Sequence, residues 1–332
     1  MTNPPESATP DRTPRHRRAP HWAAVLAAAF TLPLLYVGGS VTTYRVGMAV
    51  PDWPTTFGMN MFLYNFWNAP FGVQVEHTHR LYGAAVGVVT IALCAWFFLH
   101  ESRGWMKALG LAALAIVIAQ GLLGGTRVTR NSTTLAALHG CLGQVFFAMM
   151  VALATFTGRD WLGDARRTPD AKGLRRLAVV TLGLIAAQIG LGAWVRHFSG
   201  LAAAAFHGVV GVAILGVAAH LFVRAKRHEP PKPSLRSAAR ALEVLAGLQI
   251  LLGFASFFAL WPFDGMPRAV GFYQAVARTV HQTNGAVILA AAVVTTLRAF
   301  RHLGPASPAR VEGPSPTSPP ESEPVPNLEV VA

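Results

Sequence analysis

Ala119-Gln120-Gly121-Leu122-Leu123-Gly124, followed by His139-Gly140-Cys141-Leu142-Gly143, returns later in the chain as Ala187-Gln188-Ile189-Gly190-Leu191-Gly192, followed by His207-Gly208-Val209-Val210-Gly211. In both copies the glutamine precedes the histidine by nineteen residues. A third copy of the first motif is Gln249-Ile250-Leu251-Leu252-Gly253. Self-similarity at a fixed spacing indicates repeated structural units.

The composition indicates that these units lie in a membrane. Hydrophobic residues make up 52% of the 332-residue chain and charged residues only 13%, too few to cover the surface of a soluble domain of this length. The net charge is +13, but the basic residues form short clusters between apolar runs, which excludes a nucleic-acid-binding face. A membrane helix needs about 20 apolar residues. Eight runs qualify: 22–41, 79–99, 108–125, 134–157, 177–195, 201–223, 241–261 and 280–297.

The sequence therefore predicts an all-α integral membrane protein with eight transmembrane helices in two pseudo-symmetric four-helix halves. Lys and Arg residues are about three times as frequent on the side of the membrane that holds both termini as on the other side. This predicts that both termini are cytoplasmic. The two cysteines, Cys94 and Cys141, are expected at different depths and hence as free thiols. The predicted units are a disordered N-terminus (1–20), an N-terminal half (21–158), a basic cytoplasmic loop (159–176), a C-terminal half (177–302) and a disordered tail (303–332).

Every even-numbered predicted helix carries His-x-x-x-Gly at its outer end; the four histidines are His79, His139, His207 and His281. Imidazole is a common axial ligand of haem iron, so two helices that each offer one histidine can hold one haem. We interpret the glycine one turn below each histidine as space for a flat ring. Hydrogen bonding between helices, or zinc or copper binding, is the alternative for these histidines. His77 and His197 are expected to have simple surface roles, the alternative being support of the neighbouring ligands.

The two halves differ three residues before each histidine, where Glu76 gives the first half a carboxylate. We predict that Glu76 is an acid/base or charge-stabilising group; the alternative is an ion pair with Arg80. The loop with Pro51-Asp52-Trp53-Pro54 is predicted to cap the first-half site. Outward arginines are candidates for contacts with haem propionates, the alternative being interfacial snorkelling; these are Arg80, Arg127, Arg130, Arg196 and Arg278.

These residues resemble the haem A synthase family over about Val37 to Ala292. The matching stretches include Pro51-Asp52-Trp53-Pro54, the Glu76-x-x-His79-Arg80 motif and His281-Gln282-Thr283-Asn284-Gly285. The resemblance implies oxidation of a haem O methyl group to a formyl group, giving haem A for terminal oxidases. It implies haem b on His207 and His281, substrate haem O on His79 and His139, and a catalytic Glu76. Some family members carry cysteine pairs in the outer loops, and this chain has none.

Two other functions stay open at this stage. A non-catalytic dihaem cytochrome would hold two equivalent haems and give Glu76 no task. A haem carrier would need a route from the inner side, whereas the predicted ligands all lie outside. For the synthase we expect the lipid bilayer and haem O as partners, together with an electron acceptor and a haem O synthase that hands over the substrate. The expected location is the plasma membrane.

Overall fold

The computed structural model describes residues 18–163, 167–170, 173–198, 200–259 and 270–304. Within them, eight helices are long and apolar enough to cross a membrane. They are α1 (Arg18–Thr43), α2 (Phe71–His100), α3 (Gly104–Thr129), α4 (Thr133–Thr157), α6 (Leu174–Phe198), α7 (Leu201–Lys226), α8 (Pro233–Phe258) and α9 (Phe272–His302). This confirms the predicted all-α, eight-helix membrane fold.

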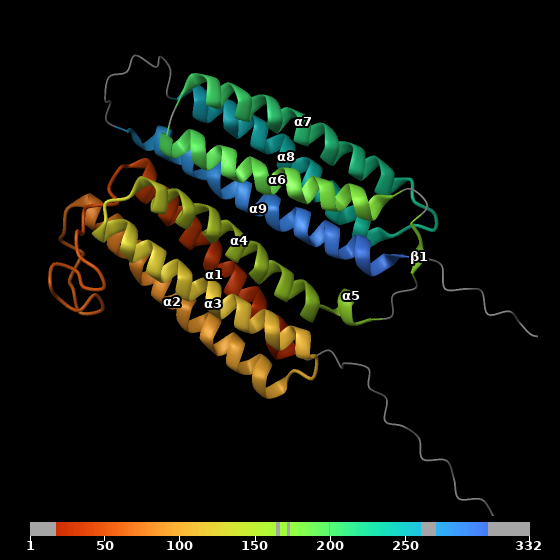
Figure 1. Ribbon diagram of the computed structural model, residues 1–332, viewed down its shortest axis with the longest axis horizontal. Coiled ribbons are helices and arrows are strands. Elements are labelled where there is room, and N and C mark those ends of the chain that lie inside the picture. Colours follow the sequence, from red (N-terminus) through yellow and green to blue (C-terminus); the bar gives the residue numbers. More distant parts are fainter. Residues whose placement is uncertain (1–17, 164–166, 171–172, 199, 260–269, 305–332) are drawn as a thin grey trace, which may run out of the picture.

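The helices contact one another in two closed cycles (Figure 1). The first group is α1–α2–α3–α4, the second is α6–α7–α8–α9, and in each the last helix returns to the first. The groups meet where α4 contacts α9 and α6, and where α1 contacts α9. The pseudo-symmetry of two halves stays a prediction, but the cycles place α2 diagonally opposite α4 and α7 diagonally opposite α9.

Side-chain burial follows what a bilayer requires. Large apolar side chains point outward, among them Leu99, Val209 and Leu251, because lipid solvates them as well as a protein core would. The buried positions between helices are rich in alanine, for example Ala218, Ala239 and Ala286, which lets the backbones approach closely. Cys94 and Cys141 are both free, as predicted.

Two helices begin earlier than the apolar runs indicate. α2 starts at Phe71 rather than His79, and α9 starts at Phe272 rather than Val280. The extra turns carry polar residues such as Glu76 and Arg278, which depress hydropathy without breaking the helix. The added turns move His79 and His281 away from the starts of their helices.

Some segments predicted to be disordered or loop form helix or strand. Residues 18–20 belong to α1, although they fall in the predicted disordered N-terminus. β2 (Leu303–Gly304), from the predicted disordered tail, pairs in parallel with β1 (Thr168–Pro169), from the predicted basic loop. A one-turn helix, α5 (Arg159–Leu162), also lies in the predicted basic loop. The rest of the predicted disordered ends lies outside the described residues.

Candidate haem sites

Two pairs of histidines face each other inside the two helix groups. His79 of α2 and His139 of α4 have ring centroids 6.1 Å apart with perpendicular rings. His207 of α7 and His281 of α9 have centroids 6.2 Å apart at 73°. The histidines predicted to work in pairs are thus brought together in those pairs, by helices that lie diagonally across each group.

The geometry of both pairs fits two axial ligands of one metal ion. A metal–imidazole bond of about 2 Å on each side puts two ring centroids roughly 6 Å apart. The Nδ1 atom of every one of the four rings is buried with no hydrogen-bond partner among the described residues. No group of three or more His, Cys, Asp and Glu side chains that suits a metal ion occurs in the described chain. Two protein ligands per site suit haem, whose porphyrin supplies the remaining ligands.

A glycine of the preceding helix makes room for each histidine ring. A β-carbon on Gly38 of α1 would lie 2.7 Å from Cε1 of His79, and one on Gly124 of α3 would lie 3.1 Å from Cε1 of His139. In the second group Gly192 and Gly253 stand in the same relation to His207 and His281, at 3.1 and 3.3 Å. These four glycines let the helices close around the rings and fix their position.

The glycines that follow the histidines have a different role from the one predicted. Gly143 lies against the side-chain amide of Gln120, Gly211 against Gln188 and Gly285 against Gln249. The interpretation that this glycine leaves space for a flat ring is therefore wrong in three of the four motifs. Only the space beside Gly83 is open.

Those glutamines tie each odd-numbered helix to the next histidine. Nε2 of Gln120 donates to the carbonyl oxygen of His139 at 3.1 Å, and Nε2 of Gln188 donates to that of His207 at 2.7 Å. Gln249 donates likewise to His281 at 3.0 Å. The sequence repeat contains these residues, and the constant spacing from glutamine to histidine in the first two copies was the signal for this role.

The His79 site lacks this glutamine. Leu34 stands four residues before Gly38, where the other copies have glutamine four residues before their glycine. With no amide to fill it, the space beside Gly83 stays open. The first group therefore has one histidine site of the common type, at His139, and one without a glutamine contact, at His79.

Glu76 and Arg80 join α2 to the outer loop. The Glu76 side chain is 1% exposed, and its Oε1 lies 2.9 Å from Nη2 of Arg80. Its Oε2 accepts a hydrogen bond of 3.0 Å from the N–H of Val50. Arg80 also donates to the carbonyl oxygens of Val50, Asp52 and Thr55 at 2.7–3.0 Å. This network, here called the loop knot, fastens residues 50–55 above the start of α2.

The loop crosses to α3 as well. The indole of Trp53 lies on Gly125, where a β-carbon would be 2.6 Å from its Cε2. The guanidinium of Arg127 lies on Gly47, where a β-carbon would be 2.6 Å from Nη1. Gly125 is adjacent to Gly124, which holds the His139 ring. The loop therefore runs over the outer end of the first group, as Figure 1 also shows at the outer ends of α2 and α3.

Asp52 organises the tip of this loop. Its carboxylate accepts hydrogen bonds from the N–H groups of Phe57 and Gly58 and from the hydroxyl of Thr55. Burial opposes the charged form, but the hydrogen bonds from Gly58, Thr55 and Phe57 outweigh it and lower the pKa of Asp52 to about 2. The loop is thus closed on itself around the Asp52 carboxylate.

The predicted propionate ligands differ in their surroundings. The guanidinium of Arg80 is occupied by the loop knot, and that of Arg196 donates to Gly39 and Thr43 of α1 across the seam. Arg130 is exposed. For the half-buried Arg127 and Arg278, no hydrogen bond of the guanidinium is found among the described residues, which leaves their donors available. Arg127 lies three residues along α3 from Gly124, which contacts the His139 ring.

His77 contradicts the prediction of a simple surface role, since its side chain is 0% exposed. Its Nδ1 lies 3.2 Å from the hydroxyl of Thr56, and its ring packs on Tyr64 and Phe66 of the outer loop at 5.3 and 4.8 Å. His77 is thus a core residue of the loop. His197 is half-buried rather than a surface residue.

Comparisons with known proteins point to one family. The family model described as cytochrome oxidase assembly protein, COX15-CtaA, matches residues 20–207, which include Glu76 and three of the four histidines. The heme A synthase of Alkalihalophilus pseudofirmus is 28% identical over 218 residues, or 63% of this chain and 71% of that protein.

More distant relatives carry the same name. The heme A synthase of Shewanella oneidensis is 24% identical over 52% of this chain and 56% of that protein. That of Rhodopseudomonas palustris is 28% identical over 55% of this chain and 58% of that protein. Against these two relatives, the chain spans slightly more than half of their length.

Proposed function

This chain belongs to the COX15-CtaA family of cytochrome oxidase assembly proteins, and from that premise we propose that it is a haem A synthase. The reaction is a four-electron oxidation of one methyl group of haem O to a formyl group, through two hydroxylations and the loss of water, with the expected external electron acceptor as the oxidant. The enzyme is accordingly an oxidoreductase. It is a multi-pass membrane protein, and we place it in the plasma membrane with both termini in the cytoplasm.

The observation that carries this proposal is that two histidine pairs of equal geometry have unequal surroundings. Ring separations of 6.1 and 6.2 Å suit one haem each. Among the described residues, which leave out 199 and 260–269 at the same end of the second group, only the first pair lies near a loop held by a buried carboxylate. We assign the first pair, His79 and His139, to the substrate haem O, and the second pair, His207 and His281, to a resident haem b that supplies a one-electron redox centre.

The chain's own residues hold and enclose the substrate. His79 and His139 orient the macrocycle, and the open space beside Gly83 suits a ligand that must arrive and depart. Arg127 offers free donors to a propionate. The loop knot keeps the cap over the site, so that water is excluded from the reacting methyl group. Both oxygens of Glu76 are engaged, so its contacts support a positioning role through Arg80 and Val50 beside the catalytic role proposed from the sequence.

A dihaem cytochrome is the second candidate, and the near-identical geometry of the two histidine pairs favours it. A dihaem cytochrome has no need of the loop that caps the first histidine pair. It also predicts that both haems stay bound through purification, whereas a synthase releases its product from the first pair.

The deciding experiment is pigment extraction after co-expression with a haem O synthase in a host that makes no haem A. The extracted haems are separated by chromatography and quantified per amount of protein. Haem A in the extract supports the synthase, and its loss in the His79→Ala variant assigns the reaction to the first pair. Haem B alone, with haem O unchanged and the protein folded, would instead establish the cytochrome.

A further inference from the structure

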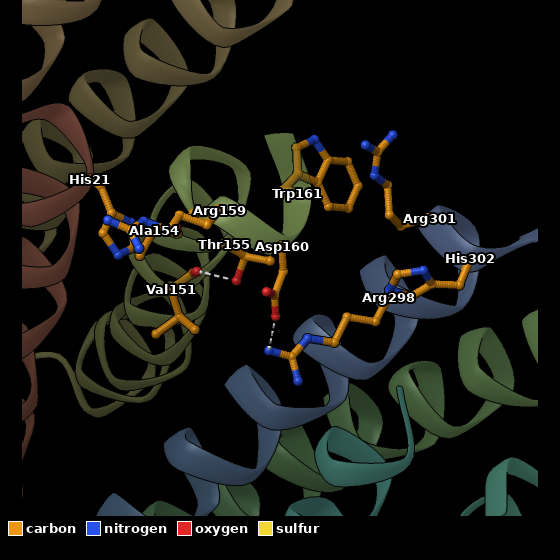
Figure 2. Close-up of a pocket in the computed structure, with 11 residues that line it drawn as sticks. His21, Val151, Ala154, Thr155, Arg159, Asp160, Trp161, Arg298, Arg301 and His302 are labelled. Carbon is orange, nitrogen blue, oxygen red and sulfur yellow. Dashed lines mark hydrogen bonds and ion pairs between the residues drawn. The ribbon is translucent and has the colours of Figure 1, made fainter. Parts of the chain in front are cut away.

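The end of the molecule opposite the histidine pairs holds a pocket that the proposed reaction does not use (Figure 2). It has a volume of about 340 Å³ and lies at the seam between the two helix groups. Its walls come from the first turn of α1, from the last turn of α4 with α5, and from the last turn of α9. By the charge distribution of the chain, this is the cytoplasmic end.

The pocket is strongly cationic. Three arginines, Arg159, Arg298 and Arg301, line it against a single carboxylate, that of Asp160. The ion pair between Arg298 and Asp160 is long, at 3.8 Å, and the Asp160 side chain is 71% exposed. The three guanidinium groups are therefore not neutralised by the one acid among the residues that line the pocket.

Several donors of these arginines lack an acceptor. Nε of Arg301 is buried with no hydrogen-bond partner among the described residues, although its Nη2 donates to the carbonyl of Gly163. For Arg159 no hydrogen bond is found in the described part of the chain, and its side chain is exposed. An unsatisfied buried donor is costly, so an acceptor from outside the chain would stabilise the pocket.

The pocket also has a polar end and an apolar end, which follow one another along the axis of α4. Trp161 lies beside Arg301, with the guanidinium 5.6 Å from the ring centroid, and tryptophan is a residue type enriched at membrane–water interfaces. Val151 and Ala154 form the wall one to two turns deeper along α4. A ligand with a charged head at the arginines and an apolar body along Val151 would match both parts.

We propose that this pocket binds the phosphate group of an anionic phospholipid of the cytoplasmic leaflet. Basic pockets between transmembrane helices on the cytoplasmic side recognise such headgroups, and arginine is well suited to phosphate. A bound headgroup touches α4–α5 of the first group and α9 of the second, and so joins the two groups at the end opposite the histidine pairs. The proposal does not depend on the haem chemistry.

The test uses the full chain in phosphatidylcholine nanodiscs that contain a minor fraction of phosphatidylglycerol. Native mass spectrometry counts the phosphatidylglycerol molecules that the wild type retains. Arg159→Gln removes one exposed cation and lowers the affinity about fivefold, and Arg159→Gln with Arg301→Gln lowers it roughly thirtyfold. The matched control is Arg176→Gln with Arg236→Gln, two exposed arginines outside the pocket.

The outcomes of the experiment distinguish a lipid headgroup from free inorganic phosphate as the ligand. Retention by the wild type and the control, with loss in the pocket variants, establishes the lipid site. Inorganic phosphate that raises the unfolding temperature of the wild type in pure phosphatidylcholine, but not of Arg159→Gln, would assign the same pocket to free phosphate. Equal phosphatidylglycerol retention in all variants, with unchanged size-exclusion profiles and no effect of phosphate, overturns the proposal.

Discussion

The indole of Trp53 rests on the backbone of α3 at Gly125, in a space that no other residue type would leave open. A β-carbon at Gly125 would clash with Cδ2 of the indole and lie 2.6 Å from Cε2 and Cε3. The next residue toward the helix start, Gly124, seats the His139 ring. The cap and the proposed substrate ligand are thus fixed by two adjacent glycines of one helix.

Gly125→Val is expected to displace Trp53 and lift the cap while α3 stays helical. Misplacement of a site by about 1 Å costs up to about a hundredfold in rate, so haem A per amount of protein should fall by roughly ten- to a hundredfold in the co-expression assay. Gly121→Val is the matched control on the same helix, because nothing lies within 4 Å of its β-carbon. Equal haem A yields from both variants would show that the contact with Trp53 does not matter.

The loop knot predicts that Glu76 and Arg80 act together. Removal of either partner leaves the other buried and unpaired, which costs about 3–5 kcal/mol locally, since their side chains are only 1% and 9% exposed. Glu76→Ala and Arg80→Met should each strongly reduce haem A production and make residues 44–70 sensitive to protease. The double variant should be no worse than either single one.

The same comparison separates a positioning role from a catalytic one. If Glu76 acts chemically on the substrate, Glu76→Ala will lose haem A while Arg80→Met, with an equally mobile loop, keeps much of it. The protease sensitivity of the loop is the readout that a purely chemical role does not change. A result of this kind would contradict the positioning role and restore Glu76 as the catalytic residue.

The sequence predicted the helices and the histidine pairs because both leave periodic signals. It misplaced the start of α2 by eight residues, since Glu76 and His77 are polar residues paired to a loop far from them in sequence. It misread three of the four glycines after the histidines, because the glutamine that fills the space beside each of these three comes from another helix. The pocket with Arg159 and Arg301 is assembled from three separated segments, which no local pattern reveals.

Substitution of the second histidine pair should remove the resident haem without unfolding the protein. His207→Ala and His281→Ala are each expected to abolish the bis-histidine haem absorbance, because one remaining imidazole cannot form a six-coordinate iron with two histidines. His220→Ala is the control on α7, since this histidine is exposed and has no counterpart in the repeat. An unchanged spectrum in His207→Ala would rule out this pair as the ligands.

The His79 site has Leu34 where the His207 site has Gln188. Replacing Gln188 by leucine therefore makes the His207 site resemble the His79 site. Gln188→Leu removes the 2.7 Å hydrogen bond to the carbonyl of His207 and places leucine where α1 has Leu34. The haem absorbance should persist, but the free energy of haem loss, measured by denaturant titration, should drop by about 1 kcal/mol, the typical contribution of one hydrogen bond. Complete loss of haem would mean that the glutamine has a larger role than holding the helix.

Asp52 makes the order of the cap depend on pH only in strongly acidic solution. Its pKa is lowered from 3.8 to about 2, so the charged form is the one that the folded loop stabilises. A lowered folded-state pKa adds stability that is complete above about pH 4 and is lost as the pH falls toward 2. Asp52→Asn removes this dependence, because a neutral amide has no charge to lose.

Pepsin cleavage within residues 44–70 measures the effect, normalised to a free peptide of the same residues to cancel the protease's own pH profile. The wild-type loop should become more accessible between pH 4 and 2, whereas the Asp52→Asn loop should be more accessible throughout and show no further change in that window. Because the hydrogen bonds come from the Phe57 and Gly58 backbone and the Thr55 hydroxyl, cleavage should appear first beside those residues. Parallel pH profiles for the two proteins would show that Asp52 does not control the loop.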